Sequence, residues 1–266
     1  MNLDALFKHY KDAVLSLNHL ANFYRKSLFH SQKGLDYCSK RGIDSNMIDK
    51  FLIGYDPGIV YNKNFFETYQ IDPILLERIG VLKKNNDNVY HSFFSHHLIF
   101  PIFDLKGNVI AICGRTLDNS LPKYRMTKTS EIFQKSLSLY GLYQSLNSII
   151  KYRTVFVVEG NVDVISCYKA GIHIVVSPFG TSFMYTHFLL LKTFADYFIF
   201  CFDNDDAGRK AKQKVIEMSK RLDNIKLGFL DLEGAKDPDE FIYAHSSHPQ
   251  MLINSIKDMR DQMSLS

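Results

Sequence analysis

The sequence predicts an α/β protein in two parts: a mixed α+β amino-terminal region over 1–148 and a parallel sheet with helices on both faces over 149–266. Three observations lead to this fold class. A chain of 266 residues with 46% hydrophobic side chains can bury a substantial core. In the first half, the spacing of apolar residues changes from helical to strand-like at His97. In the second half, short apolar runs alternate with helical segments, which is typical of a parallel sheet covered by helices.

The first predicted elements are helices. Residues 3–29 place apolar side chains three and four positions apart, which indicates a helix with one buried face. Shorter helices are expected over 34–40 and 45–51, each bounded by turn residues. Residues 62–82 repeat the helical pattern. The polar segment 83–88 is then expected to be a surface turn.

A β-hairpin is expected next. Residues 98–104 (LIFPIFD) and 109–117 (VIAICGRTL) have the composition of strands. The segment between them, Leu105-Lys106-Gly107-Asn108, has the composition of a turn. The two strands are therefore predicted to pair antiparallel.

Four almost continuously apolar runs mark the second half. Continuous apolarity indicates burial on both faces, as in the central strands of a parallel sheet. Helical segments separate each run from the next, as expected for a parallel sheet covered by helices. The runs are 155–160 (VFVVEG), 173–180 (HIVVSPFG), 197–205 (YFIFCFDND) and 225–231 (IKLGFLD).

Carboxylates follow three of these four strands. Because the carboxyl ends of parallel strands lie at one edge of the sheet, these side chains are expected to converge there. Another acid, Asp163, lies four residues after Glu159, about one helical turn further on. We call the full set the acidic edge: Glu159, Asp163, Asp203, Asp205, Asp237 and Asp239.

A cluster of this many carboxylates predicts a metal site. Negative charges gathered at one place repel one another and destabilise the protein unless a cation neutralises them. Oxygen ligands without His or Cys favour Mg²⁺ or Mn²⁺ over zinc. The alternative is a structural role: Asp205 or Asp206 could simply cap the helix that follows, and Asp237 and Asp239 could begin the next one. Glu159 is harder to explain structurally, because it follows four buried apolar residues and precedes a glycine.

Composition excludes several classes of protein. The balance of 32 Lys+Arg against 28 Asp+Glu gives a net charge of +4, which does not by itself identify a nucleic-acid-binding protein. The four cysteines contain no CxxC pair, so neither a zinc site nor a disulfide framework is expected. No apolar run approaches the roughly 20 residues that span a membrane. We therefore expect a cytoplasmic protein with no membrane partner.

The acidic motifs resemble those of a known fold. Residues 159–164 (EGNVDV) resemble the EGxxDV motif of the Toprim fold, and 203–208 (DNDDAG) resemble its DxDxAG motif. Asp237-Pro238-Asp239 is similar to the DPD that follows in primases. The Toprim fold also occurs in topoisomerases and nucleases, so the fold alone does not determine the activity.

The first half resembles the DnaG primases. The resemblance covers roughly residues 16 to 245. Two departures are Met126, where the family usually has asparagine, and the additional acid Asp206. The matching segments, in family order, are Lys40-Arg41-Gly42, Ile53-Gly54-Tyr55, Phe100-Pro101-Ile102, Gly107, Gly114-Arg115, Pro122-Lys123-Tyr124, Ile132-Phe133, Lys135 and Leu139-Tyr140-Gly141-Leu142.

The resemblance implies a catalytic core that joins ribonucleoside triphosphates into short RNA primers on a single-stranded DNA template. Glu159, Asp203 and Asp205 would be catalytic, and the whole acidic edge would bind Mg²⁺ or Mn²⁺, with Glu159 acting either as a ligand or as the base. A basic amino-terminal part would contact template or nucleotide. The residues implied for this binding are Arg41, Arg115, Lys123 and Lys135. Arg125 and Lys128 add positive charge nearby, and Tyr124 offers a ring either for base stacking or for the core.

The resemblance also implies partners. The family's zinc-ribbon module has no counterpart here, and 27 residues follow Asp239, so a replicative helicase and a separate zinc-ribbon protein are the expected partners. Two other functions remain open at this point. A Toprim-type nuclease would use the same acids and metal ions to hydrolyse DNA, and a non-catalytic module would only bind single-stranded DNA.

Overall fold

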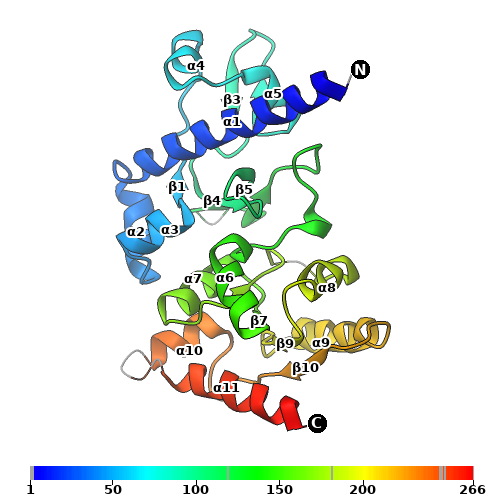
Figure 1. The fold of residues 1–266 in the computed structure, drawn as a ribbon. Helices are drawn as coiled ribbons and strands as arrows, with labels where there is room; N and C mark the ends of the chain where they lie inside the picture. The colour runs from blue at the N-terminus through cyan, green and yellow to red at the C-terminus, as the bar shows by residue number, and fades with distance from the viewer. Residues whose placement is uncertain (1–2, 119, 181, 246–247, 249, 266) are drawn as a thin grey trace. The chain divides into compact units, whose positions relative to one another are not determined.

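The computed structural model describes residues 3–118, 120–180, 182–245, 248 and 250–265. The chain forms two compact units, Met1–Gln134 and Lys135–Ser266, which we call the amino-terminal and carboxy-terminal units (Figure 1). In the described ranges, no helix combines the length and the apolar character needed to cross a membrane.

Five helices are described in the amino-terminal unit, and the predictions for the first three are confirmed. Side chains at the N-cap positions explain where several of them begin, because Asp44, Asn62 and Asp72 each accept a hydrogen bond from a backbone amide of the first turn. The helices are α1 (Leu3–Leu28), α2 (Gln32–Lys40), α3 (Ser45–Phe51), α4 (Lys63–Tyr69) and α5 (Pro73–Arg78).

The region 62–88 differs from the prediction. The helical pattern over 62–82 is interrupted, because Gln70 adopts a left-handed conformation with φ 53° and ends α4. Helix α5 then begins with its proline at the first helical position, where no amide donor is needed. The expected turn over 83–88 is also partly wrong. Strand β2 (Leu82–Lys84) pairs antiparallel with β3 (Tyr90–Ser92), so the turn is restricted to the residues between them.

The main sheet of the amino-terminal unit has four strands in the order β1-β4-β5-β6. The predicted hairpin is confirmed, since β4 and β5 pair antiparallel over their whole length. Helix α1 packs against β1, β4 and β5, which buries its apolar face. The strands are β1 (Gly54–Tyr55), β4 (His97–Phe103), β5 (Val109–Thr116) and β6 (Tyr124–Met126).

The carboxy-terminal unit contains the predicted parallel sheet. Its strand order is β10-β9-β7-β8, and all three pairings are parallel. The second predicted strand is much shorter than its apolar run, because only two residues of 173–180 pair with β7. The strands are β7 (Thr154–Val157), β8 (Val175–Val176), β9 (Tyr197–Phe200) and β10 (Lys226–Phe229).

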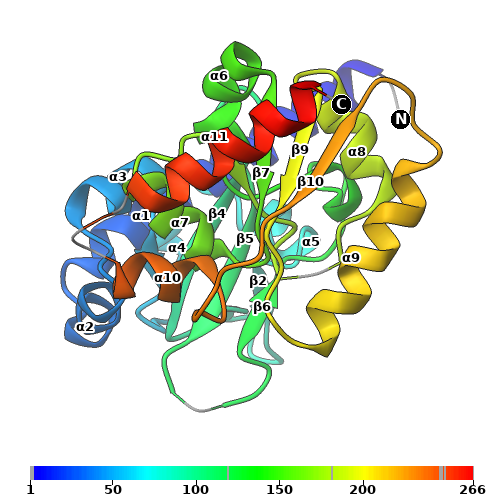
Figure 2. The ribbon, with the colours of Figure 1, turned by 90° about the horizontal axis from the view of Figure 1, so that it is seen from below.

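Helices cover both faces of this sheet (Figure 2). On one face, Val155 and Phe198 form a buried core with Phe188 of α8 and Val215 of α9. Successive strand residues point to opposite faces, so the buried Ile199 faces the other side, where α11 contacts β9 and β10. The helices are α6 (Leu142–Tyr152), α7 (Asn161–Lys169), α8 (Tyr185–Lys192), α9 (Asp206–Ser219), α10 (Pro238–Ala244) and α11 (Gln250–Leu265), with a short 3₁₀ turn at Lys135–Leu137.

The boundary between the units lies at residues 134 and 135. A division between 148 and 149 would pass through α6, which contacts β7 and β8 of the parallel sheet. The apolar residues of this helix, including Leu142 and Ile149, belong to the same buried core as the strands. Helix α6 is therefore part of the carboxy-terminal unit, while the functional division of the chain stays a prediction.

Candidate active site

The ends of β7 and β9 bring Glu159 and Asp203 together. These strands are parallel neighbours, with Val157 opposite Phe200, so the residues that follow them leave the sheet side by side. A carboxylate oxygen of Glu159 (Oε1) accepts a hydrogen bond of 2.9 Å from the backbone amide of Asp203. This bond links the first and second motifs directly and fixes the Glu159 side chain at the edge of the sheet.

Asp163 links the first motif to the third. Its carboxylate accepts hydrogen bonds from the Gly160 amide at 2.9 Å and from the Asp239 amide at 3.4 Å. Only 7% of the residue is exposed. Burial raises the pKa of Asp163 to about 7, and the negative charges of Asp237, Asp203 and Asp239 add to the effect of burial. The negative charge of Asp163 is therefore unfavourable in this position, and either a proton or a bound cation can neutralise it.

The same electrostatic pattern extends to the other central acids. Burial raises the pKa of Glu159, and the charges of Asp203 and Asp205 raise it further. Burial also raises the pKa of Asp203, followed by the charge of Asp237. One cation opposes this, since Lys236 Nζ lies 3.7 Å from Asp203 Oδ2. Negative charge at this edge exceeds the positive charge that the neighbouring side chains supply.

Two members of the acidic edge also cap helices, as the structural alternative proposed. Asp205 is the N-cap of α9 and accepts from the Gly208 amide at 2.9 Å. Asp237 is the N-cap of α10 and accepts from the Glu240 amide at 2.8 Å. Each cap occupies one oxygen of a carboxylate that has two, so capping does not exclude a second role. Asp206, by contrast, is exposed and forms an ion pair with Arg209.

A glycine allows the DNDDAG turn to close. The amide of Asp205 donates to the carbonyl oxygen of Asp203 at 2.8 Å, so the chain folds tightly back on itself. A Cβ atom at Gly208 would lie 2.0 Å from that same carbonyl oxygen. No side chain fits in this space, which explains why the motif needs glycine at its end.

The acidic edge supplies hard oxygen donors, which suit Mg²⁺ or Mn²⁺. Across the described parts of the chain, no group of three or more His, Cys, Asp or Glu side chains is already arranged to hold a metal ion. The raised pKa values of Glu159, Asp163 and Asp203 nevertheless indicate a site that favours added positive charge. The oxygen ligands and the negative charge of the acidic edge therefore suit a divalent ion. The side chains are not already arranged around a metal position in the described residues.

Three further residues of this edge were not predicted from the sequence. Ser166 donates from its hydroxyl to the Asp239 carboxylate, and Lys236 lies beside Asp203. Asn161 is buried, and its side-chain amide has no hydrogen-bond partner for either atom in the described residues. Lys236 directly precedes Asp237 in the chain, a signal that sequence reasoning could have used. The positions of Ser166 and Asn161 depend on the packing of α7.

In the amino-terminal unit, Arg115 and Tyr124 are brought together. Arg115 lies on β5, is 9% exposed and donates from a terminal nitrogen to the Tyr124 hydroxyl. Its guanidinium carbon lies 4.8 Å from the ring centre of Tyr37 and 5.0 Å from that of Tyr124. Tyr124 thus positions the arginine, while base stacking on its ring stays a prediction.

The other predicted binding residues are dispersed over both units. Lys123 and Arg41 are exposed, with Arg41 at the carboxyl end of α2. Arg125 and Lys128 lie on and just after β6, close to Phe93 and Gly80, respectively. Lys135 belongs to the carboxy-terminal unit, where its carbonyl oxygen is 3.1 Å from a ring nitrogen of His187.

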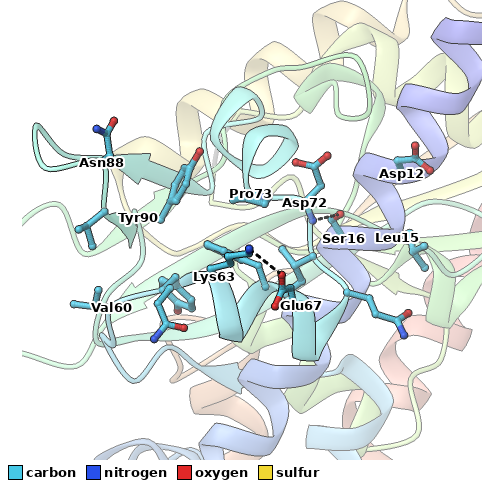
Figure 3. Close-up of a pocket in the computed structure, with 16 residues that line it drawn as sticks. Asp12, Leu15, Ser16, Val60, Lys63, Glu67, Asp72, Pro73, Asn88 and Tyr90 are labelled. Atoms are coloured by element: carbon cyan, nitrogen blue, oxygen red, sulfur yellow. Dashed lines mark hydrogen bonds and ion pairs between the residues drawn. The ribbon is translucent and has the colours of Figure 1, made fainter.

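A large pocket in the amino-terminal unit has a different character. Its volume is about 890 Å³, and it lies between α1, α4, α5 and the start of β3 (Figure 3). Its one lysine, Lys63, is paired with Glu67 at 3.7 Å, and Asp12 and Asp72 add negative charge. A pocket with this charge does not suit a phosphate group.

The geometry of the acidic edge identifies the class of domain. A parallel sheet has carboxylates after two neighbouring strands, and a tight DNDDAG turn that requires glycine follows one of them; this is the arrangement of a Toprim domain. A family model described as Toprim-like matches residues 156–242. A second model, described as the DNA primase catalytic core, N-terminal domain, matches residues 23–146.

Individual relatives agree with both models. A DNA primase from Buchnera aphidicola is 33% identical over 249 residues, which are 91% of this chain and 43% of that relative. The E. coli primase catalytic core superposes with a TM-score of 0.79 at 30% identity, covering 92% of this chain and 79% of that structure. A DnaG primase catalytic domain bound to single-stranded DNA superposes with a TM-score of 0.81 at 30% identity, covering 94% and 80%. The chain belongs to the family of DnaG-type DNA primase catalytic cores, and it spans less than half the length of the curated relatives that it matches.

Proposed function

We propose that this chain synthesises short RNA primers on single-stranded DNA by metal-dependent nucleotidyl transfer. The observation that carries the proposal is the linkage of three acidic motifs by two hydrogen bonds, from the Asp203 amide to Glu159 and from the Asp239 amide to Asp163. The raised pKa values of the same acids support a cation at this edge. Membership of the primase family makes nucleotidyl transfer the chemistry to which such an edge is suited.

Roles within the acidic edge follow from these contacts. Asp203, Asp205 and Asp237 would hold Mg²⁺ or Mn²⁺, with Asp163 and Asp239 as secondary ligands. A bound divalent ion supplies positive charge where negative charge develops on the phosphoryl oxygens. Glu159 keeps one oxygen on the Asp203 amide, so its second oxygen is the one available to bind an ion or to accept the proton of the attacking ribose 3′-hydroxyl.

Template and nucleotide binding is proposed for the amino-terminal unit and Lys135. A neighbouring structure of the family has single-stranded DNA bound, which supports the same ligand here. Ribonucleoside triphosphates are the expected second substrate, and a replicative helicase and a separate zinc-ribbon protein are the expected partners. The Aquifex aeolicus primase structure includes a zinc-binding domain together with an RNA polymerase domain, which supports a zinc-binding module acting with a core of this kind.

The test is ribonucleotide incorporation on single-stranded DNA. Labelled ribonucleoside triphosphates are incubated with Mg²⁺ or Mn²⁺ and a template that carries a different label, and RNA products, DNA fragments and bound template are each followed. We expect short RNA products that require the metal and disappear with EDTA. Cleavage of the DNA in place of RNA synthesis would contradict the proposal and favour a Toprim nuclease. Strand binding with neither reaction would indicate a non-catalytic module.

A further inference from the structure

A second pocket in the amino-terminal unit is strongly basic. Its volume is about 390 Å³, and it lies between β2, the segment around Phe93 and the end of β6. Its charged lining consists of Lys83, Lys84 and Lys128 together with a single acid, Glu77. We call it the Phe93 pocket, because this half-buried ring forms part of its wall.

Positive charge in the Phe93 pocket is not balanced by the protein. Arg125 adjoins it, with its guanidinium carbon 5.5 Å from the Phe93 ring centre, so four cations face one carboxylate. Burial raises the pKa of the Tyr90 hydroxyl, and the negative charge of Glu77 raises it further, so this carboxylate lies near Tyr90. Within the part of the chain that the structure describes, none of Lys83, Lys84, Arg125 and Lys128 is in an ion pair. Like charges held together in this way repel one another, so the pocket favours an anion.

The aromatic ring narrows the choice of anion. The ammonium nitrogen of Lys83 (Nζ) lies 4.5 Å from the Phe93 ring centre, so cations flank the ring. These cation–π contacts position the charges without neutralising them. An aromatic face beside unpaired cations matches a nucleotide, because a base has a flat face for stacking and a phosphate carries the opposite charge.

The side chain of Lys128 packs against the backbone of Gly80 at the edge of this pocket. Gly80 has φ +81°, and the side-chain carbons of Lys128 lie 3.1 to 3.2 Å from the point where a Cβ at Gly80 would be. The lysine stem therefore lies directly on the glycine backbone. Lys128 is also one of the residues that line the pocket.

We propose that the Phe93 pocket binds one nucleotide unit of a single nucleic-acid strand. The base stacks on Phe93 in place of a cation that lies over the ring in the structure, and the flanking phosphates bind the cations of β2 on one side and Arg125 and Lys128 on the other. A nucleotide within a strand has a phosphate on each side of its base, which suits cations contributed by two separate segments. The identification of the strand as template rests on the proposed function, whereas the binding chemistry does not.

The first test removes two of the charges. Lys83→Gln with Lys128→Gln is compared with a control of equal charge change, Lys11→Gln with Lys106→Gln, whose side chains are exposed and do not line this pocket. Binding of a fluorescent oligothymidine is measured by anisotropy over a range of salt concentrations in EDTA. We expect weaker binding for the first pair only, with the slope of log affinity against log salt reduced by about 0.7 for each lost contact. An unchanged slope in both pairs overturns the proposal.

The second test addresses the ring. Phe93→Leu removes the stacking surface and Phe93→Tyr keeps it, so we expect a loss of affinity of roughly 5- to 100-fold for the leucine variant alone. Thermal unfolding of each variant checks that the fold is kept. Equal, full binding by both folded variants contradicts the stacking role.

A parallel titration distinguishes the source of the nucleotide. Magnesium-bound ATP is titrated into the charge variants and their control. Loss of oligothymidine binding with unchanged ATP binding supports the strand, and loss of ATP binding alone overturns it in favour of a free nucleotide. Because strand binding is measured in EDTA, failure of primer synthesis with strand binding intact counts against the proposed function and not against this pocket.

Discussion

The acidic edge and the Phe93 pocket place charge in opposite ways. Carboxylates of the acidic edge lie at strand ends or, for Asp163, in the helix that follows, and backbone amides fix both Glu159 and Asp163. Cations of the Phe93 pocket sit at the ends of long side chains that rest on a ring or a glycine. Short, rigid side chains suit a site whose geometry controls chemistry. Long, adaptable side chains suit contact with a flexible nucleic-acid strand, which is the ligand proposed for the Phe93 pocket.

The largest effect is expected for Glu159→Gln, which should reduce catalysis but not strand binding. Glu159→Gln keeps the shape of the side chain but removes its charge, so we expect primer synthesis to fall by at least roughly 100-fold. Affinity for oligothymidine in EDTA should stay unchanged, because the Phe93 pocket is intact. The matched control is Asp206→Asn, an exposed acid of the same turn, which should retain activity. Near-full synthesis by Glu159→Gln would remove it from the catalytic set.

A smaller effect concerns stability and pH. The pKa of Asp163 is raised to about 7 in the folded protein, above its ordinary value of 3.8, so the proton stabilises the folded state. This contribution is fully present below pH 3.8 and is lost as the pH rises through 7, by an amount on the order of a few kcal/mol. In EDTA, Asp163→Asn should therefore unfold at higher denaturant concentration than the wild type at pH 8 and should lose this pH dependence.

Metal ions should reverse the difference in stability between the wild type and Asp163→Asn at pH 8. Added Mg²⁺ should stabilise the wild type at pH 8 more than Asp163→Asn, because the ion replaces the proton at the acidic edge. Denaturant unfolding with and without Mg²⁺ measures both. If Asp163→Asn is equally destabilised at pH 5 and pH 8 in EDTA, its role is purely that of a hydrogen-bond acceptor.

The smallest effect concerns how the amino-terminal cations are positioned. Tyr124→Phe removes the hydroxyl that accepts from Arg115 but keeps the ring beside the guanidinium. We expect the free energy of unfolding to fall by about 1 kcal/mol. The salt slope for oligothymidine should not change, because the charge remains. A changed slope would show that the hydroxyl also directs Arg115 to a phosphate.

Sequence reasoning was strongest where periodicity and burial agree. The parallel strands of the carboxy-terminal unit were predicted because apolar runs such as 197–205 can be buried on both faces only in a covered sheet. The acids at their ends were then placed by topology alone. By contrast, 62–82 has a continuous helical pattern, but Gln70 turns left-handed and the segment splits into α4, α5 and part of β2. A left-handed residue such as Gln70 cannot be predicted from the spacing of apolar residues, because the spacing continues across it.

Contacts between distant segments were not accessible from the sequence. The Phe93 pocket joins β2 to residues near the end of β6, and no motif connects them. Arg125 and Lys128 were predicted as positive charge close to the family residues, but Lys83 and Lys84 were assigned to a surface turn. Asn161 and Ser166 were missed for the same reason, because their importance depends on which atoms surround them.

The hydrogen bonds around Asp163 and Asp239 also connect two helices of the carboxy-terminal unit. Helix α10 is attached to α7 through the Asp239 amide on Asp163 and the Ser166 hydroxyl on Asp239. The same carboxylates that would receive an ion therefore fasten one helix to another. An ion that binds only the assembled edge raises the free energy needed to detach α10, and this increase grows with the logarithm of the ion concentration once that concentration exceeds the dissociation constant. Hydrogen–deuterium exchange should thus slow at the amides of Phe241 to Ala244 when Mg²⁺ is added, so that occupancy of the edge can be followed without any substrate.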